Sequence, residues 1–258
     1  MVQRPKDVLC QVVSHEELLP GVFRTLFRPT EDFPRPLAGQ FLQVEPSQGL
    51  FPATRRPFTV NRLVQGDIEI VFDVVGRGTG VMANFSPGST VRVLGPLGMG
   101  WRTDVPGKWL LIGGGLGAAG FQFLMDTVDC SGVLIGAAGN HRVLPLDGSA
   151  PLHIATEDGS MGEKGLVTGL MNPELLAGCG NIAICGPVAM MHAVWNSLPD
   201  VHRKKVQVST ESRMGCGWGV CEGCSIPASQ GGYVKCCQDG PVFPGSEIDW
   251  DRWKEAGL

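Results

Sequence analysis

The amino-acid sequence predicts a mixed β and α/β fold with three modules, and three observations support this prediction. Short apolar or alternating segments rich in β-branched residues fill the first hundred positions. Apolar strands then alternate with helical segments, and after residue 210 this patterning stops and cysteines crowd together. We therefore expect an antiparallel barrel domain at 1–102, an α/β domain at 103–210 and a cysteine-rich subdomain at 211–258.

Six strands form the predicted barrel, and Gly, Pro and Asp separate them. They are expected over residues 7–18, 22–29, 39–46, 56–63, 67–75 and 90–98. Six short strands at this spacing fit a small antiparallel barrel or a sandwich. A helix is expected over residues 81–85, directly after the sequence Gly-Arg-Gly-Thr-Gly.

The predicted α/β domain begins with a buried strand, a glycine-rich turn and a helix over residues 108–128. Further strand and helix segments are expected over residues 132–140, 152–162, 181–198 and 204–212. Continuously apolar strands that alternate with helices are typical of a parallel sheet with helices on both faces.

Composition and charge argue against several classes of protein, namely nucleic-acid-binding, membrane-spanning and secreted proteins. The 258 residues are 43% hydrophobic and 18% charged, which is an ordinary globular composition. A net charge of -4 argues against a nucleic-acid partner, because such proteins usually present a basic face. No apolar run approaches the length of a membrane span, and residues 1–10 lack the apolar stretch of a signal peptide. We expect a cytoplasmic protein.

The nine cysteines fall into two groups. Four of them stand apart among apolar or small residues, as small buried hydrophobes do, namely Cys10, Cys130, Cys179 and Cys185. The other five lie between residues 216 and 237. In a reducing compartment such crowding indicates metal binding more often than a disulfide framework.

The spacing within the second group favours an iron-sulfur cluster. Cys216, Cys221 and Cys224 follow the pattern C-x4-C-x2-C, and Cys236 and Cys237 come further along the chain. This is the spacing of plant-type [2Fe-2S] ferredoxins, whereas zinc sites usually contain two separate C-x2-4-C pairs. The intervening glycines let backbone N–H groups approach the sulfurs. Structural zinc is the alternative.

Two motifs in the barrel region are compatible with nucleotide binding. A charged and a hydroxyl side chain lie on one predicted strand, in the sequence Arg56-Pro57-Phe58-Thr59, which alone would be an ordinary strand. Gly76-x-Gly78-Thr79 opens a predicted helix whose free N–H groups can bind a phosphate, and a tight turn is the alternative.

Two further motifs belong to the α/β region. Gly113, Gly114, Gly115 and Gly117 form a turn between a strand and a helix, which is the phosphate-binding arrangement of a Rossmann-like fold. The strict G-x-G-x-x-G spacing is absent, and close helix packing is the alternative. The sequence Cys185-Gly186-Pro187 ends another strand, at the edge where open α/β sheets bind ligands; a buried cysteine and two core methionines are its alternative.

The order of these motifs resembles the ferredoxin reductase superfamily. The matching sequences are R-P-F-T, G-R-G-T, G-G-G-L-G, T-E-D-G-S-M-G-E-K-G and C-G-P-V-A-M-M. Members of this superfamily bind FAD on the barrel and a nicotinamide nucleotide on the α/β domain. The segment from Glu211 to Phe243 is similar to one branch in particular, the electron-transfer subunits of two-subunit dihydroorotate dehydrogenases, and the similarity runs through essentially the whole chain.

The resemblance implies a set of cofactor-binding residues. Arg56, Pro57, Phe58 and Thr59 would hold the flavin ring and its linker, and Gly76, Gly78 and Thr79 would hold the FAD pyrophosphate. The NAD(H) site would be framed by Gly114, Gly115, Gly117, Cys185, Gly186 and Pro187. The last cluster ligand of the family lies two residues before Asp-Gly-Pro, so the ligand set would be Cys216, Cys221, Cys224 and Cys237.

The chain departs from the family pattern at three places. Ala118 and Ala119 stand where a proline is usual near the end of the glycine turn. Cys236 is a spare thiol next to a predicted ligand. Trp218 is bulkier than expected between two cysteines, and it would shield the cluster or contact a partner.

The resemblance also implies an electron relay between NAD(H), FAD, a [2Fe-2S] cluster and a partner. The partner would be an FMN-containing catalytic subunit that interconverts dihydroorotate and orotate in pyrimidine biosynthesis, with two copies of each subunit. This chain shows no substrate loop with a Cys, Ser or Lys base, so alone it should not oxidise dihydroorotate. NAD is favoured over NADP because only His141 and Arg142 follow the second α/β strand.

Two alternative functions stay open from the sequence. The same module could serve another oxidoreductase, of the hydrogenase or sulfite reductase type. The chain could also be a cluster-bearing redox sensor with a vestigial FAD fold, although both barrel motifs are intact.

Overall fold

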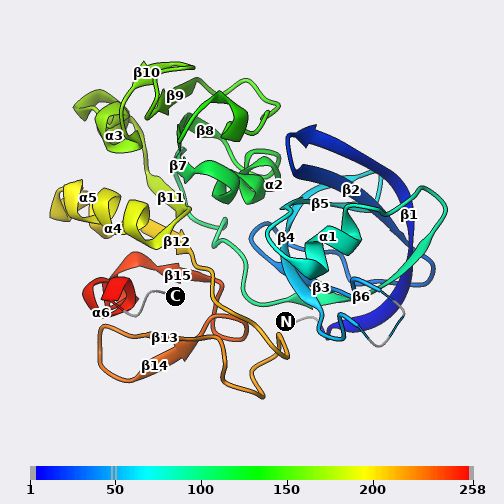
Figure 1. Ribbon diagram of the computed structural model, residues 1–258. Helices are drawn as coiled ribbons and strands as arrows, with labels where there is room; N and C mark the ends of the chain where they lie inside the picture. Colours follow the sequence, from blue (N-terminus) through cyan, green and yellow to red (C-terminus); the bar gives the residue numbers. More distant parts are fainter. Residues whose placement is uncertain (1–3, 48, 50, 256–258) are drawn as a thin grey trace.

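Six antiparallel strands close into a barrel at the right of Figure 1, drawn in blue to cyan. The structure is a computed structural model, and it describes residues 4–47, 49 and 51–255. The strands are β1 (Lys6–Leu19), β2 (Val22–Pro29), β3 (Phe41–Val44), β4 (Arg56–Val64), β5 (Asp67–Asp73) and β6 (Thr90–Leu97). Their order around the barrel is β1-β2-β5-β4-β3-β6. The predicted antiparallel barrel is confirmed.

The helix of the barrel domain begins earlier than the sequence suggests. Helix α1 spans Arg77–Met82, so its expected position over residues 81–85 is wrong. The reason is the hydroxyl of Thr79, whose oxygen accepts hydrogen bonds from the backbone N–H groups of Val75 (3.0 Å) and Gly76 (3.2 Å). These bonds turn the chain at Gly76, and the glycine motif becomes the first turn of the helix.

A seven-stranded sheet forms the centre of the second domain, at the left of Figure 1. Its order is β10-β9-β8-β7-β11-β12-β15, and every neighbouring pair is parallel except β12 and β15. The strands are β7 (Trp109–Gly114), β8 (Cys130–Ala137), β9 (Leu152–Thr156), β10 (Glu163–Lys164), β11 (Asn181–Cys185), β12 (Val206–Ser209) and β15 (Val242–Pro244). The predicted parallel sheet is confirmed.

Helices cover both faces of this sheet, as the continuously apolar strands predict. The five helices of this region are α2 (Phe121–Met125), α3 (Pro173–Gly178), α4 (Val188–Ser197), α5 (Asp200–Arg203) and α6 (Trp250–Glu255). On one face, Leu111 of β7 belongs to the same core as Phe121 of α2. On the other face, Ile112 packs in a second core with Met191 of α4 and Trp253 of α6.

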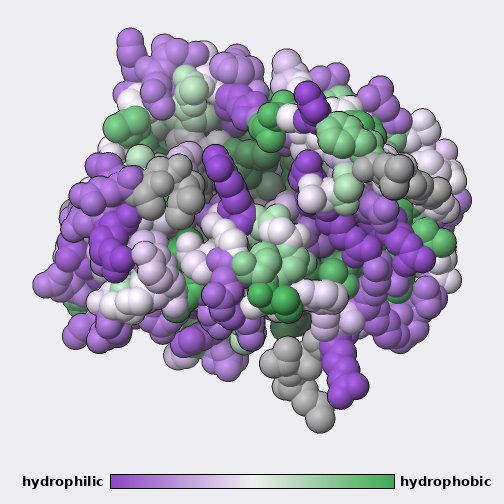
Figure 2. Space-filling model, turned by 60° about the horizontal axis from the view of Figure 1, so that its bottom comes forward, coloured by the Kyte–Doolittle hydropathy of each residue, from purple (hydrophilic) through white to green (hydrophobic). Residues whose placement is uncertain are grey.

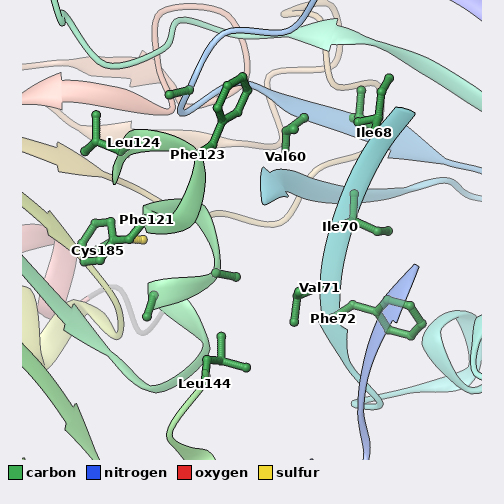
Figure 3. Packing of buried hydrophobic residues seen from close by; sticks show 14 of the residues in the cluster. Val60, Ile68, Ile70, Val71, Phe72, Phe121, Phe123, Leu124, Leu144 and Cys185 are labelled. Carbon is green, nitrogen blue, oxygen red and sulfur yellow. The ribbon is translucent and has the colours of Figure 1, made fainter. Parts of the chain in front are cut away.

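The barrel and the α/β domain share one hydrophobic core. Figure 3 shows Ile70 and Phe72 of β5 in the same cluster as Phe121 and Leu124 of α2. Salt bridges join the domains at the rim of this core, since Arg62 of β4 lies 2.7 Å from a carboxylate oxygen of Asp126 and 2.8 Å from one of Asp147. Arg142 and Asp73 form another such pair. The two domains are therefore joined both by a shared core and by ion pairs.

The chain after β12 leaves the sheet and later returns to it. It forms the hairpin of β13 (Ser225–Pro227) and β14 (Tyr233–Lys235), then re-enters as β15, the antiparallel edge strand (Figure 1, orange to red). The boundaries 1–102, 103–210 and 211–258 stay predictions, and their two outer ends lie beyond the described residues. Within the described ranges, every helix is too short or too polar to cross a membrane.

Candidate functional site

A cavity of about 320 Å³ lies between the barrel and the sheet. We call it the flavin cavity, because several of the predicted flavin residues line it. In Figure 2 a hollow with hydrophobic, green surface separates the two lobes. The predicted flavin residues that line the cavity are Pro57, Phe58, Thr59 and Thr79, and Cys185 lines it from the α/β domain. Ser212 also lines this cavity, and its hydroxyl oxygen is buried with no hydrogen-bond partner among the described residues. An apolar slot with one unsatisfied hydroxyl fits a flavin ring, which is flat and carries polar atoms on its edge.

Arg56 and Gly78 meet next to this cavity, at the first turn of α1. A Cβ atom at Gly78 would lie 2.6 Å from Nε of Arg56, so the missing side chain lets the guanidinium rest on the helix. Arg56 also donates to the carbonyl of Thr54 at 2.6 Å. Gly76 is the residue before the helix and has an extended backbone. A fixed guanidinium beside free helix N–H groups suits a pyrophosphate.

A second cavity, of about 670 Å³, lies at the carboxyl ends of the parallel strands. We call it the nucleotide cavity, because predicted nucleotide residues line it. The predicted nucleotide residues in its lining are Gly114, Gly115, Gly117, Gly186 and Pro187. A Cβ atom at Gly117 would lie 2.6 Å from Cα of Gly186, so both turns need glycine to come this close. Cys185 lines the flavin cavity instead of this one.

Glu211 lines both cavities, and the sequence motifs did not single it out. Its side chain is open to the cavities, but protein surrounds it on most other sides, and this burial raises the pKa of its carboxyl above the ordinary value. Burial and, second, the charge of Glu211 raise the pKa of Cys185 to about 12. The only sequence signal for Glu211 is its place just after β12, at the ligand-binding edge of the sheet.

The four predicted cluster cysteines lie together in two pairs. Sγ of Cys224 lies 3.1 Å from Sγ of Cys237. Cys216 interacts with the side chain of Cys221 and accepts its backbone N–H at 3.5 Å. A [2Fe-2S] core has two irons that each take two thiolates, so a two-plus-two arrangement fits it. Within the described ranges, no three His, Cys, Asp or Glu side chains converge as they would around a metal ion.

Backbone N–H groups point at these sulfurs. Gly219 donates to Cys237 at 3.1 Å, and Trp218 donates to Cys216 at 3.4 Å. Burial would raise the pKa of Cys216, but its backbone hydrogen bonds outweigh burial and lower this pKa to about 6. A lowered pKa favours the thiolate, which is the form that binds metal. Burial, with the neighbouring thiol of Cys224 next, raises the pKa of Cys237 to about 12.

The sulfur of Cys236 is hydrogen-bonded to Thr210. Its Sγ lies 3.3 Å from Oγ1 of Thr210 and 3.3 Å from the carbonyl oxygen of the same residue. It is fully buried, and burial raises its pKa to about 12. This geometry supports Cys237 over Cys236 as the fourth ligand.

Phe41 connects the cluster loop to the flavin cavity. Its side chain lines the cavity and packs in one core with Cys224, Cys236 and Cys237. Met214 makes the same connection from the cysteine segment. The cysteine loop and the cavity therefore share Phe41 and Met214 as common wall residues. Phe41 is a second residue that the sequence motifs did not indicate.

The fold defines the class of protein. The structure superposes on that of an NADH-dependent reduced ferredoxin-NADP oxidoreductase, studied for flavin-based electron bifurcation, with a TM-score of 0.82, 26% identity and coverage of 99% of this chain and 94% of the other. A ferredoxin reductase in carbazole 1,9a-dioxygenase shares the fold at a TM-score of 0.66 and 18% identity, over 81% of this chain and 70% of the other. The fold is that of the ferredoxin reductases.

The sequence comparisons identify the family within this class. Residues 211–249 match the iron-sulfur cluster binding domain of dihydroorotate dehydrogenase B. The electron transfer subunit of dihydroorotate dehydrogenase B (NAD(+)) from Desulforamulus reducens is 34% identical, over 83% of this chain and 87% of the relative. The subunit of the same name from Bacillus pumilus is 32% identical, over 94% and 98%. The chain belongs to the family of dihydroorotate dehydrogenase B electron transfer subunits.

Proposed function

We propose that this chain relays electrons between NAD(H) and a partner through FAD and a [2Fe-2S] cluster, and that it works in the cytoplasm. The main support for this proposal is that the nucleotide cavity, the flavin cavity and the cysteine loop are direct neighbours. Leu116, Gly117 and Glu211 line both the nucleotide cavity and the flavin cavity. Phe41 and Met214 join the flavin cavity to the cluster loop. Neighbouring sites in this order suit a chain of carriers.

The chain's own residues bind and orient the carriers. When bound, FAD would supply hydride exchange with a nicotinamide and single-electron exchange with a cluster. Arg56 and the first turn of α1 would hold its pyrophosphate, and Phe58 and Thr59 would hold its ring. Gly117 and Gly186 shape the nucleotide cavity. Cys216, Cys221, Cys224 and Cys237 would hold the cluster.

The proposed nucleotide is NAD(H) rather than NADP(H). Arg142 lines the nucleotide cavity, but its guanidinium already pairs with Asp73 of the barrel. Glu157 lines the same cavity, and a carboxylate suits a ribose hydroxyl better than a second phosphate. The names of the curated relatives also specify NAD(+).

The proposed partner is an FMN-containing dihydroorotate dehydrogenase catalytic subunit, in a complex with two copies of each chain. The name shared by the relatives supports this partner. Trp218 and Val220 lie in the cluster loop with 54% and 75% of their surface exposed. Apolar side chains in such positions suit a surface that a partner covers.

A visible absorption spectrum of the anaerobically purified protein, before and after NADH, tests the relay. We expect flavin bands with a broad iron-sulfur shoulder, both of which NADH bleaches, and a much slower response to NADPH. Dithionite gives the fully reduced reference. A colourless protein that contains zinc would contradict the proposal and leave only the fold.

Glu211→Gln is expected to flatten the dependence of stability on pH. Because burial raises the pKa of Glu211, the folded chain keeps a proton that the unfolded chain has already released above the ordinary value of 4.5. The free energy of unfolding therefore falls as pH rises from that value through the folded pKa. Urea unfolding of the holoprotein at several pH values measures this slope. Glu31→Gln, an exposed carboxylate, is the control, and equal slopes in wild type and Glu211→Gln would refute the assignment.

A further inference from the structure

Gln43 of β3 is a buried polar side chain without a partner. It is 0% exposed, and neither its Oε1 nor its Nε2 has a hydrogen bond within the described residues. Buried amides in folded proteins are nearly always hydrogen-bonded, because an unsatisfied group loses its water without replacement. An exception of this kind points to a group that binds there.

The strand directs Gln43 toward the cysteine loop. Leu42 and Val44 belong to the core inside the barrel, so Phe41 and Gln43 lie on the outer face of β3. Phe41 packs there against the cluster cysteines. Gln43 lies against Gly217, since a Cβ atom at Gly217 would be 2.7 Å from Nε2. The loop can come this close only because Gly217 is a glycine with φ of +83°.

The cysteine loop beside Gln43 contains acceptors that could serve as its missing hydrogen-bond partner. Gly217 follows Cys216, a predicted cluster ligand whose sulfur already attracts backbone N–H donors. Two other polar side chains of this region have partners: Lys235 donates to the carbonyl of Gly219 at 3.0 Å, and Thr210 donates to the carbonyl of Pro241 at 2.9 Å. Among the described residues of the cysteine segment, the hydroxyl of Ser212 is also without a partner, but that residue lines the cavity between the barrel and the sheet. The Gln43 amide is thus a free donor next to a site rich in sulfur acceptors.

We propose that Gln43 donates a hydrogen bond from Nε2 to a sulfur of the cluster and so raises the reduction potential of the cluster. This inference rests on the proposed function, because it requires a [2Fe-2S] cluster in the loop. Reduction adds negative charge to the cluster, and a donor stabilises the reduced form more than the oxidised form. Gln43 is the register partner of Pro57 on the adjacent strand β4, which carries the predicted flavin residues.

Gln43→Leu removes the donor and keeps a side chain of similar size. We expect a midpoint potential shifted to more negative values, measured by redox titration of the full-length holoprotein with EPR detection, at unchanged iron content. A second readout does not depend on any variant. In wild-type protein labelled with ¹⁵N in glutamine side chains, pulsed EPR of the reduced cluster is expected to detect a glutamine nitrogen coupling.

Gln40→Leu is the matched control. Gln40 lies three positions earlier, but its amide is satisfied, because Nε2 donates to the carbonyl of Gly98 at 2.8 Å and Oε1 accepts the N–H of Leu37 at 2.9 Å. We expect the wild-type potential in this variant. An unchanged potential in Gln43→Leu together with no glutamine coupling would overturn the inference while the proposed function stands. A wild-type protein without a [2Fe-2S] signal would instead overturn the proposed function itself.

Discussion

Cys237→Ala is expected to abolish cluster binding, with iron falling from about two atoms per chain to near zero. Sγ of Cys237 lies 3.1 Å from Sγ of Cys224 and accepts the N–H of Gly219. Without this sulfur one iron would keep a single protein ligand, and the adjacent thiol of Cys236 is engaged with Thr210. Iron and acid-labile sulfide assays on anaerobically purified protein measure the effect, and the flavin content should be retained.

Cys236→Ala provides a control one residue away. Because the sulfur of Cys236 bonds to Thr210, we expect this variant to keep its cluster and its visible spectrum. If Cys236→Ala loses the cluster and Cys237→Ala keeps it, Cys236 is the fourth cluster ligand and Cys237 is the spare thiol. Equal loss in both variants would show that the doubled cysteine acts as a structural unit.

Arg56→Leu is expected to weaken FAD binding by about 10- to 100-fold, since a hydrogen bond to a charged group contributes about 1.5–3 kcal/mol. The guanidinium rests on Gly78 and faces the first turn of α1, so its removal leaves the pyrophosphate only the helix N–H groups. Fluorescence titration of the deflavinated protein with FAD gives the dissociation constant. The loss should decrease at high salt, because screening weakens the contribution of the charge.

Arg55→Leu is the neighbouring control. Arg55 lies 2.7 Å from a carboxylate oxygen of Asp7, on the β1 side of the barrel. We expect its removal to leave FAD affinity within about twofold of wild type, because exposed ion pairs contribute little. If both variants weaken FAD equally, general damage to β4 explains the effect and the role of Arg56 is refuted.

The sequence predicted the elements of this fold better than it predicted their long-range contacts. Alternating and continuous apolar runs are local signals, so the six barrel strands and the parallel sheet were recognisable. The return of β15 to the sheet was not, because three residues carry no signal for a pairing with β12. The start of α1 was missed for a related reason, as the bonds to the Thr79 hydroxyl become visible only once the chain is folded.

The candidate site divides in the same way. Cysteine spacing and glycine turns are patterns of several residues, and most of the predicted residues line one of two cavities or belong to the cysteine loop. Arg56, Gly76 and Gly78 are not among the cavity-lining residues, and Cys185 lines the first cavity instead of the second. Glu211, Phe41 and Gln43 are single residues of common types. These three residues matter because of the tertiary contacts that they make in the folded chain. Those contacts join segments that are far apart in the sequence, so no local pattern indicates them.

The junction of β12 and β15 has a consequence for how this protein could have arisen. Ser209 and Val242 are directly paired neighbours, so residues 210–241 begin and end at the same point of the sheet. In topological terms, the cluster-binding segment is an insertion between two paired strands. Such an insertion can be gained or lost in evolution without any change in the order of the strands in the sheet. The cost of discarding it would fall on the outer face of the barrel, where Phe41, Leu94 and Leu97 would lose their cover.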